Sequence, residues 1–291
     1  MAFFYYSKFK ERTGVGNFGD DINPALLGRF IKKSILSSDK ICLFGIGTIL
    51  HDKNVNDNQH FHRKVIFSSG VGYGNLTKKL DESWDIACVR GPKSAEALGV
   101  GLEKSVCDGA ILLSDIYKKP AVRRSRGLFV PHVSSHISAG FLLKDIVESL
   151  GLDYLPPIGS SDEFIEKVAG APFLVTEAMH GAILADSMRV PWIPIGFHEF
   201  LEFKWNDWME SVGLNEGRVH LISPKCWDEN PKTQPVSITR RLYREGKAYF
   251  LKQKLRSIIA TQEPLLSAPG IIDEKKRVLL NVVNEINNRY S

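Results

Sequence analysis

The sequence lacks several features that would settle its class at once. No window approaches the roughly 18 consecutive apolar residues of a membrane-spanning helix. The first residues, MAFFYYSKFKER, hold a short apolar run that precedes the basic residues, which is the wrong order for a signal peptide. The four cysteines (Cys42, Cys88, Cys107 and Cys226) show no CxxC spacing, which argues against a zinc site and a disulfide framework. We therefore expect a cytoplasmic protein with reduced thiols, either free in solution or peripheral at the inner face of the plasma membrane.

Common enzyme signatures and a strong charge are also missing. There is no Walker motif, HExxH or GxSxG, and no internal repeat. The glycines at positions 45, 47, 70, 72 and 74 form no GxGxxG fingerprint with an acidic residue at the right distance, so a dinucleotide cofactor has little support. The 38 Lys and Arg against 33 Asp and Glu leave a net charge of only +5. Such a small excess does not indicate a nucleic-acid-binding protein.

What is present is the composition of a globular protein. Hydrophobic residues make up 43% of the 291 residues and charged residues 24%. Disordered, collagen-like and small disulfide-rich chains are excluded by these values. The length fits two domains of α/β size or one large domain.

Strand-length apolar runs alternate with helix-compatible stretches along most of the chain. A helix is predicted over 93–98, since Pro92 suits its first turn and Gly99 its exit. Further helices are predicted over 141–150 and 182–188, and strands over 41–44, 65–67, 86–89, 128–130, 173–175 and 192–195. This pattern predicts an α/β fold with parallel sheets covered on both faces, in two halves with a cleft between them.

A basic, irregular stretch at 118–126 is predicted to connect the two halves. The predicted domains are 1–122, 123–235 and a basic helical tail, 236–291. From Ser237 to Ser291 the tail carries eleven Lys and Arg against five Asp and Glu. An apolar stripe at helical spacing is flanked by basic residues, the stripe being Ala248, Leu251, Leu255, Ile258 and Ile259 and its flanks Arg244, Lys247, Lys252 and Arg256. We expect a terminal helix packed on the body with a solvated basic face. The alternative is contact with an anionic membrane surface.

Polar side chains follow the predicted strands at their carboxyl ends, where parallel sheets bind ligands. They are Asn17, Asp20, Thr48, Ser69, Arg90, Asp108, His132, Glu177 and His180. Their shared location predicts a site lined with titratable groups.

Three of these residues have chemistry that fits catalysis or anion binding. His180 stands at a helix start, where backbone N–H groups favour an anion, so it could contact a phosphate and move a proton; the alternative is a turn-capping or core histidine. Arg90 could hold a carboxylate or phosphate by two parallel hydrogen bonds, or form a surface salt bridge. Asp20 could act as a base, but Asn-x-Gly-Asp is also ordinary turn or N-cap chemistry.

Taken together, the segments resemble the polysaccharide pyruvyltransferase family. The matching pieces come in the expected order and cover residues from about 14 to about 196. They are Gly16-Asn17-Phe18-Gly19-Asp20, Gly45-Ile46-Gly47-Thr48-Ile49-Leu50, Ser69-Gly70-Val71-Gly72, Arg90-Gly91-Pro92-Lys93-Ser94-Ala95 with Leu98-Gly99, Cys107-Asp108-Gly109-Ala110, the stretch from Glu177 to Asp186, and Arg189-Val190-Pro191-Trp192. The stretch from Glu177 is the most specific and looks most like the bacterial exopolysaccharide branch, which adds ketal pyruvate to a sugar of a lipid-linked repeat unit.

The resemblance implies a glycosyltransferase-B-like (GT-B) arrangement of two Rossmann-like domains. The acceptor would belong to the first domain and the donor, phosphoenolpyruvate, to the second, with no metal or other cofactor. The family's donor-site histidine maps onto His180, its acidic residue onto Asp20 and its arginine before Gly-Pro onto Arg90, and we expect His180 and Asp20 to be catalytic. We expect Arg90 to bind substrate together with the other candidates Asn17, Ser69, Lys93, Glu177 and His132. Many relatives have Arg-Leu-His where this chain has Ala178-Met179-His180, so another cation must serve the donor, with Lys93, Arg63, Arg189 and Lys204 as unranked candidates.

The expected reaction is transfer of pyruvate to two sugar hydroxyls, forming a ketal. The expected partners are phosphoenolpyruvate, the lipid-linked sugar and, through the tail, an anionic membrane surface, but no nucleic acid. A nucleotide-sugar-dependent glycosyltransferase of the same architecture is the nearest alternative. A non-catalytic subunit of a polysaccharide assembly complex is another, although a scaffold would need none of His180, Asp20 and Arg90.

Overall fold

The structure is a computed structural model and describes residues 3–4, 16–72, 76–197, 200–223, 227 and 238–291. The chain forms two compact units, each built from separate segments. The first unit consists of Met1–Ile116, Leu201–Gly217 and Ser267–Ser291. The second consists of Tyr117–Phe200 and Arg218–Leu266. These segments differ from the predicted ranges, because two later stretches of the chain return to the first unit.

The first unit contains a five-stranded parallel sheet. Its strands are β1 (Phe3–Phe4), β2 (Ile41–Phe44), β3 (Gly47–Leu50), β4 (Arg63–Val71) and β5 (Trp84–Val89). β4 is central: β2 pairs with its first half, β3 with its second half, and β5 also pairs with it. The apolar run of β2 is buried almost throughout, as expected of a parallel strand covered on both faces.

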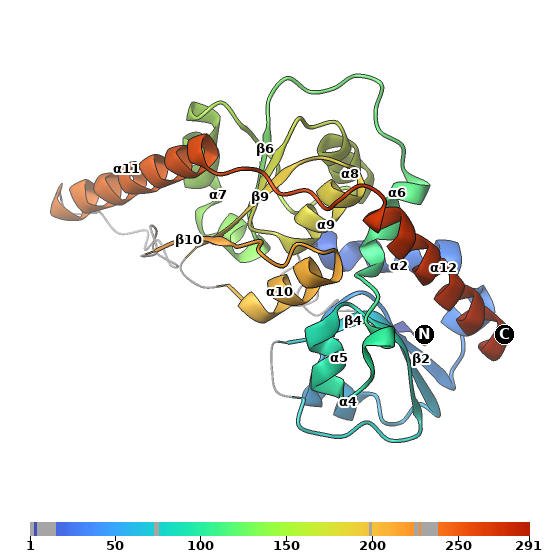
Figure 1. Ribbon diagram of the computed structural model, residues 1–291. Helices are drawn as coiled ribbons and strands as arrows, with labels where there is room; N and C mark the ends of the chain where they lie inside the picture. Colours follow the sequence, from blue (N-terminus) through green and yellow to red (C-terminus); the bar gives the residue numbers. More distant parts are fainter. Residues whose placement is uncertain (1–2, 5–15, 73–75, 198–199, 224–226, 228–237) are drawn as a thin grey trace. The chain divides into compact units, whose positions relative to one another are not determined.

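Helices and short 3-10 turns complete this unit (Figure 1). They are α2 (Phe18–Phe30), α3 (Lys33–Leu36), α4 (Asp52–Asp57), α5 (Pro92–Leu98), η1 (Leu102–Lys104), η2 (Gly109–Leu112), α6 (Leu113–Ile116), α10 (Glu202–Ser211) and α12 (Ile271–Tyr290). The prediction of α5 is confirmed, with proline in its first turn and Gly99 at its exit in the left-handed conformation (φ 65°).

The second unit contains another five-stranded parallel sheet, in the order β10-β9-β8-β6-β7. The strands are β6 (Leu128–Val130), β7 (Asp153–Tyr154), β8 (Leu174–Thr176), β9 (Trp192–Phe197) and β10 (His220–Ile222). The helices are α7 (Val133–Ser149), α8 (Ser161–Ala169), α9 (Met179–Ser187) and α11 (Ile238–Thr261). The predicted α/β class with parallel sheets is therefore confirmed, while Rossmann-like domains in a GT-B arrangement remain a prediction.

The C-terminal tail forms two helices that belong to different units. α11 packs on the second unit, where Leu251 and Leu255 are fully buried in the core and Ala248, Ile258 and Ile259 pack against it. α12 belongs to the first unit and buries Leu279, among others. The expected apolar stripe of the tail is thus a packing face of α11. In the described part of the chain no helix has the length and hydropathy to span a membrane.

Cys42, Cys88 and Cys107 are buried thiols. Burial raises the pKa of Cys88 and of Cys107 to about 12, so both remain protonated thiols at neutral pH. Cys226 lies outside the described residues.

Candidate active site

His180 lies in the first turn of α9, directly after β8. The link is held by Thr176, whose hydroxyl accepts a hydrogen bond from the Ala178 N–H and donates one to the Ala178 carbonyl, both at 3.0 Å. Ala178 is the N-cap and supplies no side-chain hydrogen bond to the helix. The first N–H groups of an α-helix have no partner within the helix, so this start of α9 suits an anion. The helix begins three residues earlier than predicted, which puts the half-buried imidazole of His180 inside its first turn.

Glu177 and His132 meet at the carboxyl ends of two neighbouring strands, β8 and β6. The Glu177 carboxylate accepts hydrogen bonds from the His132 backbone N–H (2.7 Å) and from the Ser135 hydroxyl (3.0 Å). His132 caps α7, its Nδ1 lying 2.7 Å from the Ser134 hydroxyl oxygen. The start of α7 therefore already holds a carboxylate of the protein, whereas the start of α9 has no side-chain cap.

A histidine–tyrosine pair lies one helical turn further along α7 and was not predicted. His136 Nδ1 lies 2.8 Å from the Tyr154 hydroxyl oxygen. Burial lowers the pKa of His136, while burial and the charge of Glu177 raise the pKa of Tyr154. At neutral pH this is a pair of uncharged, hydrogen-bonded side chains. The i, i+4 spacing from His132 is the sequence signal that could have singled out His136.

Asn17 and Asp20 lie at the start of α2 in the first unit. Asn17 is the N-cap, and its side-chain amide donates to Asp20 Oδ2 (2.9 Å). Asp21, not Asp20, accepts the Asn17 backbone N–H (3.0 Å). A Cβ atom at Gly16 would lie 2.2 Å from Asp21 Oδ2, so a larger residue here would displace the Asp21 carboxylate. Asn17 thus occupies the N-cap position, but no side chain caps the first turn of α2, and Asp20 is half-buried beside Asp21. Both interpretations of this turn, catalytic base and turn chemistry, stay predictions.

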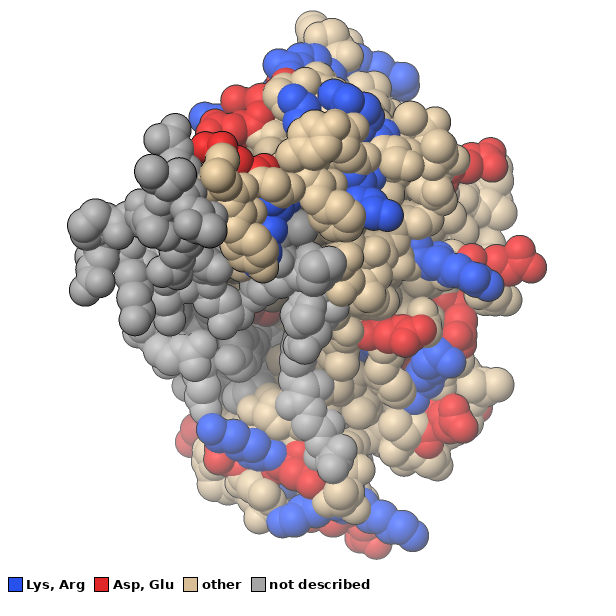
Figure 2. All heavy atoms as spheres, turned by 90° about the vertical axis from the view of Figure 1, so that its left-hand side faces the viewer, with Lys and Arg blue, Asp and Glu red and all other residues tan. Residues whose placement is uncertain are grey.

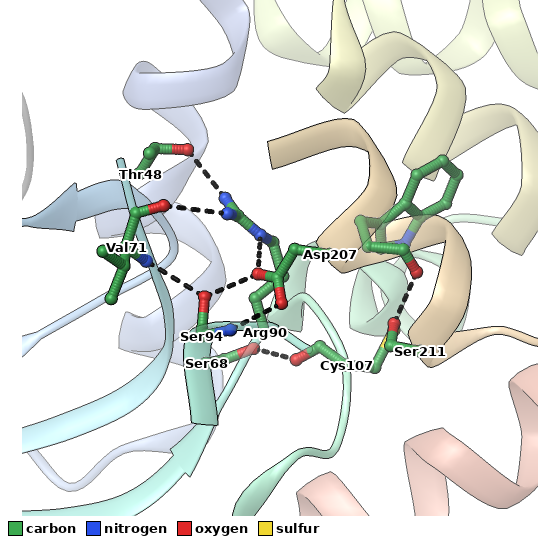
Figure 3. A network of polar contacts seen from close by, with 9 residues as sticks. Thr48, Ser68, Val71, Arg90, Ser94, Cys107, Asp207 and Ser211 are labelled. Atoms are coloured by element: carbon green, nitrogen blue, oxygen red, sulfur yellow. Dashed lines mark hydrogen bonds and ion pairs between the residues drawn. The ribbon is translucent and has the colours of Figure 1, made fainter. Parts of the chain in front are cut away.

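Arg90 is fully buried and lies in a polar network of the first unit (Figure 3). Its Nε donates to Asp207 Oδ2 (2.9 Å), its Nη1 to the Thr48 hydroxyl (2.7 Å) and its Nη2 to the Val71 carbonyl (3.4 Å). Asp207, from α10, also accepts hydrogen bonds from the backbone N–H and hydroxyl of Ser94. The sequence suggested a surface salt bridge as the alternative to substrate binding by Arg90. The structure shows that this salt bridge is instead buried.

Glycines make room for this network. A Cβ atom at Gly70 would lie 2.1 Å from the guanidinium carbon of Arg90, and one at Gly91 would lie 1.9 Å from the Asp207 carbonyl oxygen. The family motifs around these glycines therefore have a packing explanation in this chain. Substrate binding by Arg90 stays a prediction.

Two other predicted residues of the first unit also have protein partners. Ser69 is fully buried, and its hydroxyl donates to the carbonyls of Phe44 and Gly45. Lys93 forms an ion pair with Glu210 at 3.0 Å, with about a third of each side chain exposed. The buried Asp108, at another strand-end position, caps η2 by accepting the Ala110 N–H (3.0 Å).

The four candidate replacements for the family arginine are distributed over both units. Lys93, Arg63 and Lys204 belong to the first unit and Arg189 to the second. Arg189 follows the C-terminal end of α9 and pairs with Asp186 (3.7 Å). Since a helix rises about 1.5 Å per residue, Ser187 at the end of α9 already lies about 10 Å along the axis from His180, and Arg189 comes after it. Arg189 is therefore poorly placed to share a ligand with His180.

The structure brings His132, Glu177 and His180 into the second unit and Asn17, Asp20, Ser69, Arg90 and Lys93 into the first. Within the described residues, no group of three or more His, Cys, Asp or Glu side chains could hold a metal ion. The second unit offers an uncapped helix start, two imidazoles and a buried carboxylate, which can bind an anion and transfer a proton.

Comparison with known proteins identifies the family. Residues 3–199 match the family model described as polysaccharide pyruvyl transferase. Over 202 residues the chain is 37% identical to the succinoglycan biosynthesis protein ExoV of Rhizobium meliloti (strain 1021), an alignment that covers 68% of this chain and 62% of that relative. No solved structure is significantly similar. Because the family model spans more than half of its length, the chain belongs to the polysaccharide pyruvyl transferase family.

Proposed function

We propose that the protein transfers pyruvate from phosphoenolpyruvate to two hydroxyls of a sugar in an exopolysaccharide repeat unit. The observation that carries the proposal is the family match over residues 3–199, which includes the start of α9 and His180. The relative's name, a succinoglycan biosynthesis protein, supports an exopolysaccharide as the product. The chain spans 62% of that relative's length, so acceptor and activity are proposed for this chain and not transferred.

The reaction balances without a redox cofactor. A proton is added to the methylene carbon of phosphoenolpyruvate, which becomes a methyl group and leaves the neighbouring carbon electrophilic. One sugar hydroxyl attacks that carbon, a second closes the ring, and the bond to phosphate breaks. Of the two hydroxyl protons released, one balances the proton taken up by carbon and the other leaves with phosphate or solvent.

We assign the donor to the start of α9 in the second unit. Phosphoenolpyruvate carries about three negative charges, so its site needs N–H groups or cations. The start of α7 already accommodates Glu177, whereas the α9 start has no side-chain cap, which favours α9. His180, in that first turn, would donate the proton to carbon or contact the phosphate.

Asp20 is the proposed base for an attacking hydroxyl. The half-buried Asp20 carboxylate accepts a hydrogen bond from the Asn17 side-chain amide (2.9 Å), which orients it at the start of α2. Arg90 is the weaker candidate for anion binding, because Asp207 already compensates its charge. We therefore expect the imidazoles and helix N–H groups to contribute more to donor binding than Arg90 does.

The test is product analysis by mass spectrometry. The protein is incubated with phosphoenolpyruvate and a panel of glycosides, and pyruvate addition is sought. His180→Ala and Asp20→Ala should each lower the rate by about 10²–10⁴, the usual contribution of a general acid or base. His62→Ala, at an exposed position of the first unit, is the matched control and should leave the rate unchanged. Circular dichroism checks that each variant is folded.

A rate within about tenfold of wild type in either variant would reject that residue's role. A thermal-shift measurement separates the alternatives, because a ligand that binds only the folded state raises the melting temperature. Phosphoenolpyruvate should raise it and nucleotide sugars should not. Stabilisation by a nucleotide sugar alone would favour a glycosyltransferase, and stabilisation by neither would favour a non-catalytic subunit.

A further inference from the structure

The positive charge of this protein is concentrated in one helix. α11, Ile238–Thr261, contains seven Lys and Arg and one Glu, a net charge of +6. The rest of the chain then holds 31 basic and 32 acidic residues, a net charge of −1. The tail as a whole was expected to be basic, but the structure separates α11 from α12, which belongs to the other unit.

α11 has one face packed on the second unit and another that is exposed. Leu251 and Leu255 are fully buried and hold the helix on the core. Three large side chains of the same helix are instead exposed: Leu242 by 62%, Tyr243 by 61% and Tyr249 by 66%. Leu242 and Tyr249, seven residues apart, lie on the same side of the helix and opposite Leu251, so α11 exposes apolar side chains that the unit itself does not cover.

Two of the three lysines of α11 lie against aromatic rings. Lys247 Nζ lies 4.5 Å from the ring centroid of Tyr243, and Lys254 Nζ lies 5.5 Å from that of Phe250. Both pairs have the i, i+4 spacing that places side chains together on a helix. Figure 2 faces the side toward which α11 extends in Figure 1 and shows Lys and Arg side chains in the upper part of this face, with Asp and Glu side chains beside some of them. Lys247 and Tyr243 thus place a cation and an aromatic ring together outside the core, whereas Phe250 packs partly against the core.

The basic residues of α12 are arranged differently. Lys276 pairs with Asp115 (2.8 Å) and Asp273 (3.2 Å), and Arg289 pairs with Asp85 (2.7 Å). The ion pairs with Asp115 and Asp85 join α12 to other segments of the first unit. α12 contains four Lys and Arg against three Asp and Glu, a net charge of +1, so it carries much less net positive charge than α11.

We infer that the exposed face of α11 docks the protein on an anionic phospholipid surface. Basic residues near such a surface are attracted to its negative potential, and exposed Tyr and Leu side chains partition into the headgroup region. A nucleic acid would also attract the charge, but the exposed Leu242 adds nothing to phosphate recognition, whereas it adds affinity for lipid. The inference rests on charge and exposure and does not depend on the proposed reaction.

The test is co-sedimentation of the full-length protein with vesicles. Vesicles of phosphatidylcholine with phosphatidylglycerol should retain the protein, and vesicles of phosphatidylcholine alone should not. Salt at about 1 M, where the Debye length falls to about 3 Å, should release it. The double variant Lys247→Gln with Lys254→Gln should weaken binding at least about fivefold, because each basic residue contributes near such a surface.

Two further variants separate charge from apolar contact. Lys33→Gln with Lys40→Gln removes the same charge from exposed positions of the first unit and should bind as the wild type does. Leu242→Ser with Tyr249→Ser should weaken binding without changing its salt dependence. Equal binding to both kinds of vesicle, equal loss in the Lys33 and Lys40 control, or tighter binding to a single-stranded oligonucleotide than to anionic vesicles would each overturn the inference. The pyruvyl-transfer assay on a soluble glycoside is unaffected by any of these outcomes.

Discussion

The buried guanidinium of Arg90 depends on the carboxylate of Asp207, 117 residues further along the chain. Removing one partner of a buried ion pair leaves an uncompensated charge, which typically costs about 3–5 kcal/mol of stability. We expect Asp207→Asn to lower the free energy of unfolding by that amount, measured by urea denaturation with two spectroscopic probes. Asp207 donates no group to the proposed chemistry, so the loss should be one of stability.

The matched control lies on the same helix. Glu210→Gln breaks the partly exposed ion pair with Lys93, and such pairs contribute only about 0–1 kcal/mol. A loss of less than 1 kcal/mol in Asp207→Asn, comparable to that in Glu210→Gln, would show that the Arg90 charge is compensated by other means.

The pair of His136 and Tyr154 should make stability depend on pH. Burial lowers the pKa of His136 below its value of about 6.5 in an unfolded chain, so as pH falls the unfolded chain binds this proton first. The contribution of the neutral His136 to the free energy of unfolding is fully present above about pH 6.5. It is lost as the pH falls below that value. We expect the melting temperature to fall from about pH 7.5 to about pH 5.5, and to fall less in His136→Gln.

The exposed His62 supplies the control for this pH dependence. His62→Gln should reproduce the wild-type profile. The pKa of His220 is also lowered by burial, so His136→Gln should reduce the slope without removing it. Profiles of His136→Gln and wild type that coincide would contradict the assignment.

The candidate residues could be predicted from the ends of strands, but their partners could not. His132 and Glu177 follow predicted strands, and parallel pairing of β6 with β8 does bring them together. Asp207 lies within a helix and pairs with an arginine that is distant in sequence, and no local pattern encodes such a pairing. The burial of Ser69 and Arg90 also depends on which neighbours close over them, which only tertiary packing decides.

Helices were predictable where their ends carry a local signal. Pro92 and Gly99 mark both ends of α5, and the structure places the helix between them. α9 has alanine as its N-cap and no proline in its first turn, so nothing in the sequence marked its start at Met179. The error of three residues at this helix matters, because those residues carry the proposed donor site.

α11 combines one packed face with one exposed face, and substitutions should separate the two. Leu251 is fully buried, so Leu251→Ala should lower the free energy of unfolding by about 2–5 kcal/mol, as buried leucines usually do. Leu242 is 62% exposed, so Leu242→Ala should change it by less than about 0.5 kcal/mol. Chemical denaturation of both variants measures the difference. Equal effects would mean that α11 is not held by its packed face.

At the scale of the molecule, the two units were not predictable from a division of the chain into consecutive domains. The first unit also includes two later segments, Leu201–Gly217, which contains Asp207, and Ser267–Ser291, which contains α12. The predicted boundary at 122 lies close to the first passage between units, after Ile116. The later points at which the chain crosses from one unit to the other, after Phe200, Gly217 and Leu266, have no sequence signal comparable to the basic stretch at 118–126.

A fragment ending at residue 199 should therefore fail to fold, although it spans the whole family match. It would lack Asp207, leaving Arg90 uncompensated, and the buried side chains of α10 and α12, such as Trp205 and Leu279. We expect it to give no cooperative thermal transition and to be degraded rapidly by protease, compared with the full chain. A cooperative transition in the fragment would show that the first unit does not need its later segments.

The return of α12 to the first unit also bears on biosynthesis, since residues 267–291 are synthesised after every segment of the second unit. The first unit is therefore completed later than the second, although its first segment is made earlier. Maturation should therefore run in the opposite order to the usual N-terminal-first sequence. Until residues 267–291 leave the ribosome, the nascent first unit would expose the apolar surface that α12 covers, making it a natural client for chaperones.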